Sequence, residues 1–424
     1  MIYWGLCFVV LLSTLAPAKR LAGSDSHLLY LQRNGQVYGQ GYNGNGQLGI
    51  NSTAYARVPS KMLKVVHATD VCAEQFHSCV VDQGGQVKCA GRDAYGLLGI
   101  GAPPDEYEDY SSDVTMLAPV VGLKSGVAQV YCGSSSSCAR MRSGAVSCWG
   151  WYAGQVRYIP LKIAMFRRVG KGVMDIGVGD RHVCFVAVGG KLYCVGENFR
   201  GQLGIGSSLS EVKMPTPVLG LAANNIVSVK CGLQHTCAAN SAGAMFCWGS
   251  NEYGQLGNSN ITEDFYVPVP VLGVTSRVAS VWAGHYNSYA IYRDGSVRAF
   301  GQDNYGVFGT GGVPGVQPLA IVFGQNVTGV KELRGGFGSV CVLMGDDTVQ
   351  CTGFVHGGEY ESSLTLSTMV GFPVTRSPTL KPTKRPTTAP TLKPTKRPTT
   401  APTSKPTKRI TSKPTKRITS KPTQ

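Results

Sequence analysis

Short runs of alternating apolar and polar residues recur along the chain, separated by turns that contain glycine. In one representative copy, Ile226–Cys231 alternates in the way that a half-buried strand does. Two further runs, His235–Ala239 and Ala244–Trp248, flank a turn that ends in Gly243, a residue type that adopts a positive φ without steric cost. A fourth run, Val267–Val271, contains two prolines, which are typical of an edge strand. The copy therefore predicts four short antiparallel strands, the unit that forms one blade of a β-propeller.

Seven copies of this pattern follow one another. The third run of every copy leads into a glycine, and these glycines lie 46 to 59 residues apart, at Gly41, Gly91, Gly150, Gly196, Gly249, Gly301 and Gly353. Six residues before that position each copy has a turn glycine, except the last, which has Asp347. Seven blades of about 50 residues require about 350 residues, and residues 19–375 supply 357. The sequence thus predicts an all-β protein in which residues 19–375 form a seven-bladed β-propeller.

Five copies continue into a loop of the form Gly-x-Asn/Asp-x-x-Gly-x-Leu/Phe-Gly, such as Gly41–Gly49, whereas the third and seventh copies lack the closing Leu-Gly. Repeated in register between Ala22 and Gly353, this loop resembles the repeat of the regulator of chromosome condensation family, whose members form seven-bladed propellers. The first copy begins so close to the amino terminus that we expect its innermost strand to be missing. We expect Leu364–Val374 to close the ring from the other end of the chain.

Ten of the fourteen cysteines form pairs with nine residues between the partners. The pairs are Cys79 and Cys89, Cys138 and Cys148, Cys184 and Cys194, Cys237 and Cys247, and Cys341 and Cys351. Each pair is symmetric about a hairpin turn, so its side chains face each other across antiparallel strands at a Cα separation of about 4.5 Å, which suits a disulfide. Zinc binding is the alternative, but the spacing lacks a partner Cys-x-x-Cys. We predict five hairpin disulfides, each contributing about 2.5–3 kcal/mol in the loop-entropy model.

Three further cysteines, Cys72, Cys132 and Cys231, lie just before the first glycine of their copies, and we assign them to one repeat position. Other copies fill that position with small or medium apolar residues: Ala22, Val178, Ala283 and Gly335. Such a position favours free thiols packed as small hydrophobic groups. A bridge between Cys72 and Cys132, which lie in adjacent blades, is the alternative; at least one of the three stays unpaired.

Disulfides form in an oxidising compartment, and the amino terminus independently points to secretion. Residues 1–18 contain an uncharged apolar run followed by Ala16-Pro17-Ala18, an Ala-x-Ala cleavage sequence, although a basic n-region is absent. The run is shorter than the roughly 20 residues of a membrane span, so we expect no transmembrane segment. Three glycosylation sequons begin at Asn51, Asn260 and Asn326. We expect a signal peptide over residues 1–18 and a secreted glycoprotein, with the cytoplasm or nucleus as the alternative if the signal peptide is wrongly assigned.

The positive charge is concentrated at the carboxyl end of the chain. The whole chain carries a net charge of +16, of which residues 376–424 supply 14 positive charges and no negative one, leaving +2 for everything before them. This distribution removes the main argument for a specific nucleic-acid partner. The segment is a Pro/Thr/Lys repeat that cannot build a core, so we predict a disordered tail. It is either a soluble stalk or an electrostatic tether to an anionic wall or matrix polymer, and its Lys-Arg pairs are alternatively dibasic processing sites.

Motifs for catalysis or cofactor binding are absent from the sequence: it has no Gly-x-Ser-x-Gly, Walker loop, His-Glu-x-x-His or dinucleotide fingerprint. We therefore expect a non-enzymatic protein without a cofactor or metal. One repeat position holds a polar hydrogen-bonding residue in every copy: His27, His77, Ser136, His182, His235, Asn287 and Ser339. Because the position is polar in all copies, it predicts a structural role in backbone hydrogen bonding rather than catalysis.

Two features stand apart from the repeat and are candidates for partner binding. One is an acidic, tyrosine-containing insertion after the second copy, with Asp105, Glu106, Tyr107, Glu108, Asp109 and Tyr110. A calcium loop is one interpretation, but the alternation of ligands that such a loop needs is missing, which favours a solvated loop. The other feature is the pair Trp149 and Trp151 in the irregular third copy. Loops on rigid scaffolds, and tryptophan in particular, often carry binding energy.

These observations favour a secreted, monomeric, non-enzymatic propeller that binds a protein or glycan partner. The family resemblance implies a second function, guanine-nucleotide exchange on a Ran-like small GTPase, which requires reduced cysteines and a GTPase in the same compartment. A third, a secreted inhibitor of an enzyme, is similar to the bacterial beta-lactamase inhibitors that share this propeller and is a special case of the first.

Overall fold

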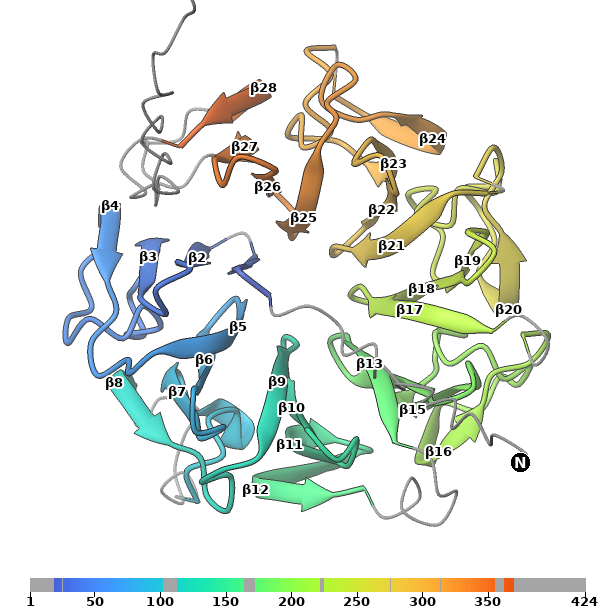
Figure 1. Ribbon diagram of the computed structural model, residues 1–424. Helices are drawn as coiled ribbons and strands as arrows, with labels where there is room; N and C mark the ends of the chain where they lie inside the picture. Colours follow the sequence, from blue (N-terminus) through green and yellow to red (C-terminus); the bar gives the residue numbers. More distant parts are fainter. Residues whose placement is uncertain are drawn as a thin grey trace, which may run out of the picture. The chain divides into compact units, whose positions relative to one another are not determined.

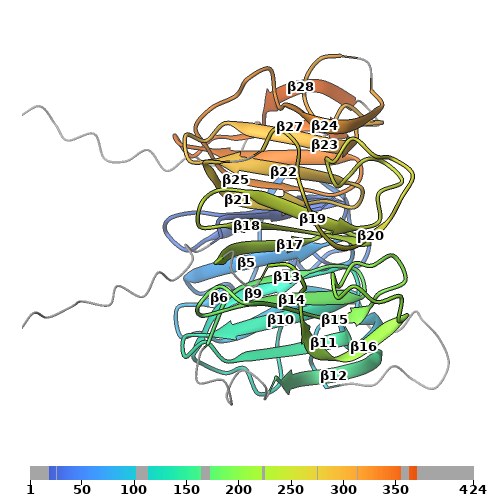
Figure 2. The same ribbon diagram turned by 90° about the vertical axis from the view of Figure 1, so that its right-hand side faces the viewer.

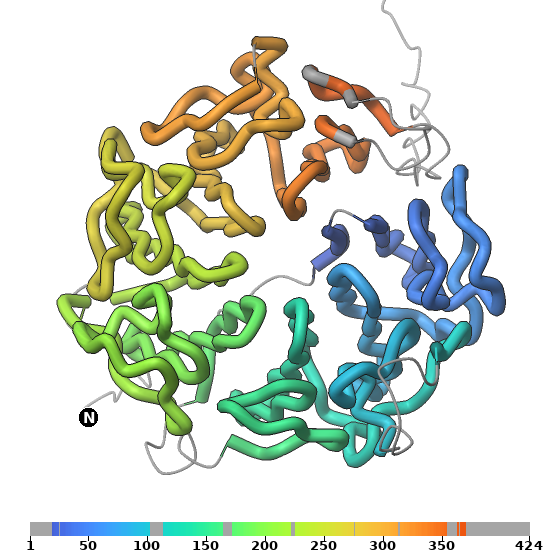
Figure 3. Tube along the Cα trace, turned by 180° about the vertical axis from the view of Figure 1, so that it is seen from behind, coloured from blue at the N-terminus to red at the C-terminus, as the bar shows by residue number. Residues whose placement is uncertain are grey.

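The computed structural model describes residues 19–24, 26–101, 113–163, 172–221, 225–274, 276–312, 314–354 and 362–369. The chain divides into two units, Met1–Thr375 and Arg376–Gln424, and every described residue belongs to the first. The strands of this unit form seven four-stranded antiparallel sheets around a common centre (Figures 1 and 3), and Figure 2 shows the ring from the side. The predicted all-β, seven-bladed propeller is confirmed. The predicted signal peptide and tail lie outside the described residues.

We name the strands of each blade A to D from the centre outward. The A strands are β1 (Leu21–Gly23), β5 (Ala68–Glu74), β9 (Val127–Cys132), β13 (Val173–Val178), β17 (Ile226–Cys231), β21 (Val278–Ala283) and β25 (Val330–Gly335). The B strands are β2 (His27–Leu31), β6 (His77–Asp82), β10 (Ser136–Met141), β14 (His182–Ala187), β18 (His235–Asn240), β22 (Asn287–Tyr292) and β26 (Ser339–Met344). The C strands are β3 (Val37–Gly41), β7 (Val87–Gly91), β11 (Val146–Tyr152), β15 (Leu192–Glu197), β19 (Met245–Gly249), β23 (Val297–Gln302) and β27 (Val349–Phe354). The D strands are β4 (Ala56–Lys61), β8 (Val114–Pro119), β12 (Gln155–Lys162), β16 (Glu211–Pro217), β20 (Phe265–Pro270), β24 (Val316–Val322) and β28 (Ser362–Thr368). A 3-10 turn, η1 (Ala94–Gly96), follows β7.

The apolar core consists of seven clusters, one at each boundary between neighbouring blades. Side chains of a strand point alternately to the two faces of its sheet, so each blade contributes to both of its boundaries. In β5, for example, Val71 and Ala73 pack toward blade 1, whereas Cys72 packs toward blade 3. Among the described residues, the boundary between blades 7 and 1 has the smallest cluster, with 8 buried residues against 11 to 13 elsewhere. Within the described part of the chain, apolar packing is therefore least extensive where the two ends of the ring meet.

The first and last blades differ from the expectation in how they are completed. β1 supplies the innermost strand of blade 1, pairing Leu21 with Tyr30 of β2, so the prediction that this strand is missing was wrong. β28 pairs with β27 of its own blade rather than with blade 1, so the predicted closure by a strand from the other end was also wrong. The three residues of β1 suffice because both main-chain edges are used. Leu31 N donates to Arg20 O, and the Glu332 carboxylate of blade 7 accepts from the main-chain N–H of Arg20 and Leu21.

The recurrent Gly-x-Asn/Asp loop is held by the side chain of its Asn or Asp. In all five copies the Oδ1 of this residue accepts the N–H of the Leu or Phe five residues later, at 2.8 to 3.1 Å. In the three Asn copies the Nδ2 also donates to the carbonyl nine residues later, the pairs being Asn43 with Ser52, Asn198 with Ser207, and Asn251 with Asn260. Asp93 and Asp303 cannot donate when ionised, and burial raises the pKa of each to about 6. The motif is thus a hydrogen-bonded clip for the C–D loop.

The structure joins the ten cysteines in the five predicted hairpin pairs. Each pair lies directly opposite in the B and C strands with a Cα–Cα distance of 4.1 Å and is almost fully buried. A sixth disulfide links Cys72 of blade 2 to Cys132 of blade 3, with 5.5 Å between the Cα atoms. Cys231 is a buried free thiol, as predicted.

The prediction that Cys72 and Cys132 are free thiols at one repeat position was wrong, and strand register explains why. Cys72 lies opposite Cys79 in its sheet, whereas Cys132 lies opposite Ser137, the residue one position nearer to the A–B turn. The two cysteines are therefore offset by one residue and point to opposite faces of their sheets. The facing surfaces of blades 2 and 3 bring them together, so the sixth disulfide ties two neighbouring blades.

Candidate partner-binding face

One face of the ring is formed by the turns that join the A and B strands and by the loops that join the C and D strands. The two sets share a face because consecutive strands of a blade run antiparallel. We call it the A–B face. Its A–B turns comprise residues 75–76, 133–135, 179–181, 232–234, 284–286 and 336–338 in blades 2 to 7.

An aromatic and cationic cluster lies on the A–B face over blades 2 to 4. The Trp151 ring packs edge-on against Tyr95, with 5.9 Å between ring centres, and Arg181 lies 5.2 Å from the Trp151 ring. Tyr95 is 43% exposed, and Arg181 pairs with Glu197 at 3.1 Å. Trp151 reaches this face because the third copy has a tight turn at 153–154 instead of the long C–D loop, so that β11 continues and pairs Trp151 with Val156 of β12. The irregular copy thus presents an aromatic side chain beside a cation.

A second cluster on the A–B face contains half-buried rings from blades 5, 6 and 7. Tyr286 packs against Tyr253 at 4.8 Å and against Phe337 at 5.8 Å between ring centres, and Tyr305 packs against Phe337 at 5.1 Å. Between the two clusters, Phe199 of the blade 4 loop is 59% exposed. Aromatic side chains thus follow the A–B face from blade 2 to blade 7.

Of the two tryptophans singled out from the sequence, only Trp151 reaches the surface. Trp149 is 0% exposed, and its Nε1 donates a 2.8 Å hydrogen bond to Leu97 O. Trp248 occupies the same position in blade 5 and bonds in the same way to Gln202 O. Trp149 is therefore a core residue of the repeat, and its assignment to partner binding was wrong. Of the acidic insertion, residues 102–112 lie outside the described residues.

The three predicted glycosylation acceptors lie in connections between strands. Asn51 and Asn326 are exposed, and both adopt a positive φ. Asn260 is half-buried, and its Oδ1 accepts the N–H of Thr262, the hydroxyl residue of its own sequon. Glycosylation at the three sites stays a prediction.

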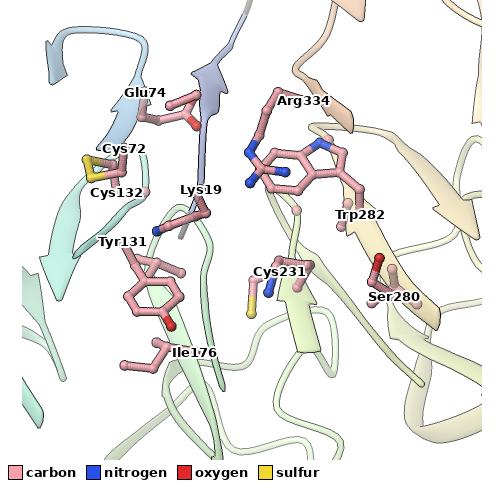
Figure 4. A pocket seen from close by; sticks show the side chains of 18 of the residues that line it. Lys19, Cys72, Glu74, Tyr131, Cys132, Ile176, Cys231, Ser280, Trp282 and Arg334 are labelled. Carbon is pink, nitrogen blue, oxygen red and sulfur yellow. A yellow bond between two sulfur atoms is a disulfide. The ribbon is translucent and has the colours of Figure 1, made fainter. Parts of the chain in front are cut away.

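The centre of the ring encloses a cavity of about 560 Å³ lined by the A strands. At the A–B face, His285 of blade 6 lies 3.8 Å from the Glu74 carboxylate of blade 2, across the mouth of this cavity. Two pairs of opposite charge lie on the wall: Lys230 with Asp175 at 2.7 Å, and Arg334 with Glu332 at 3.2 Å. Arg334 also lies over the Trp282 ring, 4.6 Å from its centre, as Figure 4 shows. These pairs neutralise the wall charge locally.

The repeated histidines join neighbouring blades. Each Nε2 hydrogen-bonds to a hydroxyl on the B strand of the next blade, in the pairs His27 with Ser78, His77 with Ser137, His182 with Thr236, and His235 with Ser288. Burial lowers the pKa of His77 to about 4 and the pKa values of His182 and His235 to about 3. The rings of His77, His182 and His235 are thus neutral. All four histidines have a structural role, as predicted, but their Nε2 partners are side-chain hydroxyl groups rather than the backbone.

Among the described residues, two groups of side chains have potential ligand atoms close together, but neither is well suited to hold a metal ion or to react with a substrate. Cys72, Cys79 and Cys132 have ligand atoms close together, as do His182, Cys184 and Cys231, but Cys231 is the only one of these cysteines outside a disulfide. Burial raises the pKa of the Cys231 thiol to about 12, which keeps it protonated and weakly nucleophilic at neutral pH. Within the described residues, no helix has the length and apolar character to cross a membrane.

Comparison with known proteins identifies the repeat. The Regulator of chromosome condensation (RCC1) repeat matches residues 34–81, 189–239 and 242–291, and a second form of that repeat matches residues 174–202 and 226–255. The chain is 31% identical to the Ultraviolet-B receptor UVR8 of Arabidopsis thaliana over 252 residues, which cover 56% of this chain and 54% of the receptor. It is 26% identical to the human E3 ubiquitin-protein ligase HERC2 over 78% of this chain but only 7% of the ligase. The chain thus spans about half the length of the receptor and a much smaller share of the length of the ligase.

Solved structures show the same fold at low sequence identity. Human WBSCR16 superposes with a TM-score of 0.65 at 22% identity, covering 74% of this chain and 83% of that one. Yeast RCC1 (Prp20), solved with Kap60, gives a TM-score of 0.68 at 18% identity, covering 83% and 88%. Prp20p of Saccharomyces cerevisiae, described with its binding properties to Gsp1p and histones, gives 0.67 at 18% identity, covering 80% and 87%.

The fold defines a seven-bladed β-propeller with disulfide-linked strands. Its sequence contains repeats that match the RCC1 repeat over residues 34–81, 174–239 and 242–291, and the chain is similar to proteins that carry this repeat.

Proposed function

We propose that this protein is an extracellular, non-enzymatic binding propeller that captures a protein partner on its A–B face. The six disulfides support the compartment, because such bonds persist in oxidising environments and are rare in the cytosol. Five of them close small hairpins in the core, and each stabilises the folded state by restricting the unfolded chain.

The binding role is carried by one observation, the run of aromatic side chains along the A–B face. Tryptophan, tyrosine and arginine are the residue types that dominate the energy of protein interfaces. Trp151 with Arg181, the exposed Phe199, and the Tyr286 and Phe337 pair supply such anchors. A rigid ring holds them in fixed positions, which reduces the entropy lost on binding.

The family alternative is nucleotide exchange on a Ran-like GTPase. Binding to Gsp1p and histones is described for Prp20p, and at 18% identity the likeness of this chain to Prp20p is one of fold. An extracellular location separates this chain from cytosolic GTPases. Inhibition of a secreted enzyme falls within the proposed binding role. We further propose that residues 376–424 hold the propeller on an anionic polymer, since their charge is entirely positive.

The test compares the full-length mature protein with four single variants. Each protein is used as a capture reagent in the extracellular fluid of the source organism. Trp151→Ala and Phe337→Ala each remove one cluster, and Phe199→Ala removes an exposed ring with little cost to folding. Val188→Ala is the matched control, because Val188 is 44% exposed in a B–C turn on the opposite face. We expect each A–B face variant to lose at least tenfold in capture of the same protein, and the control to retain it.

Two outcomes would contradict the proposal. Stimulated nucleotide release from a Ran-like GTPase at micromolar propeller would support the exchange-factor alternative. A partner whose capture is unaffected by all three face substitutions but lost in Val188→Ala would move the binding site to the other face. Thermal unfolding of each variant separates loss of binding from loss of fold.

A further inference from the structure

The first described residue, Lys19, lies at the centre of the ring beside blades 2 and 3 (Figure 4). Its main-chain N donates a 2.8 Å hydrogen bond to Oδ1 of Asp70 in β5. Its ammonium lies 3.2 Å from Oδ2 of the same carboxylate and 4.0 Å from the centre of the Tyr131 ring, and it also donates to Val130 O. Both oxygens of Asp70 therefore face Lys19, one through the main chain and one through the side chain.

Asp70 is a fully buried carboxylate, and blade 4 offers an internal comparison. Asp175 occupies the same position of β13. Each acid accepts the main-chain N–H of the next blade, from Val130 at 2.9 Å and from Val229 at 3.0 Å, and each pairs with one lysine ammonium. Asp70 differs in that its second oxygen accepts the main-chain N–H of Lys19. This extra bond is specific to the place where the chain enters the ring.

The predicted cleavage site lies at this same nitrogen. Hydrolysis of the Ala18–Lys19 amide by an endopeptidase consumes one water molecule. The new carboxylate leaves on Ala18 with residues 1–18, and the nitrogen of Lys19 becomes an amine with an ordinary pKa of about 7.7–8, which is mostly protonated at neutral pH. Hydrogen bonds between charged partners are roughly twice as strong as neutral ones.

We propose that Asp70 is the binding site for the processed amino terminus, so that cleavage after Ala18 locks the ring. In the processed chain the α-ammonium of Lys19 forms an ion pair with Oδ1 of Asp70 in place of the amide hydrogen bond. The proposal rests on the extracellular function, since it requires removal of the leader. Arg334 and Lys230 are the nearby cations, and each is already paired with its own acid, Glu332 and Asp175.

The seam of the ring explains what this ion pair accomplishes. The boundary between blades 7 and 1 has the smallest apolar cluster among the described residues, and no described strand is shared across it. Arg20, the next residue, pairs with Asp347 of blade 7 at 2.7 Å, and its main-chain N–H is bonded by Glu332. Residues 19 and 20 thus connect blades 2 and 7 through blade 1, and a charged terminus at Asp70 anchors one end of that connection.

The test uses the chain through Gln424 with two amino termini, one starting at Lys19 and one starting at Ala18, each released from a fusion by a protease. The rate at which an amine-reactive probe labels the α-amine reports its accessibility. We expect the Lys19 amine to label at least tenfold more slowly than the Ala18 amine, and the Lys19 protein to unfold at a midpoint at least about 2 °C higher. Asp70→Asn should abolish both differences, whereas Asp175→Asn should lower stability equally for both termini and leave the labelling ratio unchanged.

Equal labelling rates for the two termini, or a ratio that survives Asp70→Asn, would overturn the proposal. If Asp70→Asn does not fold, the Lys19 protein acetylated at its α-amine supplies the comparison, because it retains the hydrogen bond but not the charge. Mass spectrometry of the naturally secreted amino terminus tests the extracellular function separately. A chain that is never cleaved contradicts that function, whereas a correctly cleaved chain with an unprotected α-amine contradicts only the docking at Asp70.

Discussion

Replacing Asp303 with asparagine should stabilise the propeller at neutral pH. Asp303 holds the blade 6 loop through Phe308 N at 2.9 Å, and the residue is only 3% exposed. Burial raises its pKa to about 6, although the N–H groups of Phe308 and Val307 oppose the shift. In the unfolded chain an aspartate has a pKa of about 3.9. Between these two values the folded state binds more protons, so stability falls as the pH rises from about 4 to 6, and the cost is fully present at pH 7.

The size of the effect follows from the two pKa values. A difference of about two units corresponds to about 2.7 kcal/mol at pH 7. Residual solvation of the loop reduces this figure, and we expect Asp303→Asn to gain about 1–2 kcal/mol. The asparagine also supplies an Nδ2 donor. In blade 4 the Nδ2 of Asn198 donates to the carbonyl nine residues later, and the corresponding carbonyl for position 303 belongs to Gly312.

Urea unfolding of the mature protein at several values between pH 4 and pH 7.5 measures the gain. The advantage of Asp303→Asn should be largest at pH 7 and nearly vanish at pH 4, where the aspartic acid is protonated. Asn198→Asp is the reciprocal control and should destabilise the protein at pH 7 more than at pH 4. A gain that does not change with pH, or a loss at pH 7, would refute the argument that the buried charge is responsible.

Two other substitutions test the seam and the free thiol. Asp347 has a φ of +69° at a position where the other six copies have glycine. Asp347→Gly would relieve about 1 kcal/mol of backbone strain, but it would also remove the ion pairs with Arg20 at 2.7 Å and Arg33 at 2.6 Å. We expect the loss of the ion pairs to outweigh the relieved strain, so the variant should be less stable by about 1–3 kcal/mol at pH 7. Burial works to raise the pKa of Asp347, but the hydrogen bonds from Arg33 and Arg20 hold it below its usual value. The loss in free energy of unfolding, measured with urea, should therefore shrink as the pH falls through 4 toward 2. A variant as stable as the parent at pH 7 would contradict this prediction. Gly177→Cys should form a seventh disulfide with Cys231. A Cβ at position 177 lies 2.9 Å from Cys231 Sγ, close to the distance of about 3.0 Å between the Cβ of one cysteine and the Sγ of its partner in a disulfide. The thiol count of the denatured mature protein should fall from one to zero, and a count of two would show that the backbone does not accommodate the bridge.

The parts of the fold that follow from local periodicity were predictable, and those that depend on distant partners were not. Each hairpin disulfide follows from spacing about a turn. β1, by contrast, has only three residues and no alternation to recognise, and Glu332, more than 300 residues away, supplies the acceptor that its main chain needs. Asp347 was visible as a departure from glycine, but its two arginine partners lie in another blade. Ring closure is a long-range property that a repeat pattern does not encode.

Two errors had a signal in the sequence. Cys132 lies four residues before Ser136, whereas Cys72 lies five residues before His77, so counting from the polar position already separates their faces. Trp149 stands between a cysteine and a glycine, as Trp248 does, which marks a core position of the C strand. The aromatic clusters are different, because their rings come from neighbouring blades and meet only through the curvature of the ring.

Every blade is built from one uninterrupted stretch of chain, because even β28 pairs within its own repeat and β1 within the first. The ring can therefore be reopened at any linker without dividing a sheet. A circular permutant that starts at Val278 and joins the old ends across the blade 7 and blade 1 boundary should keep all seven sheets. Duplication or loss of one repeat likewise adds or removes a whole blade, so the unit that is inherited and the unit that folds coincide.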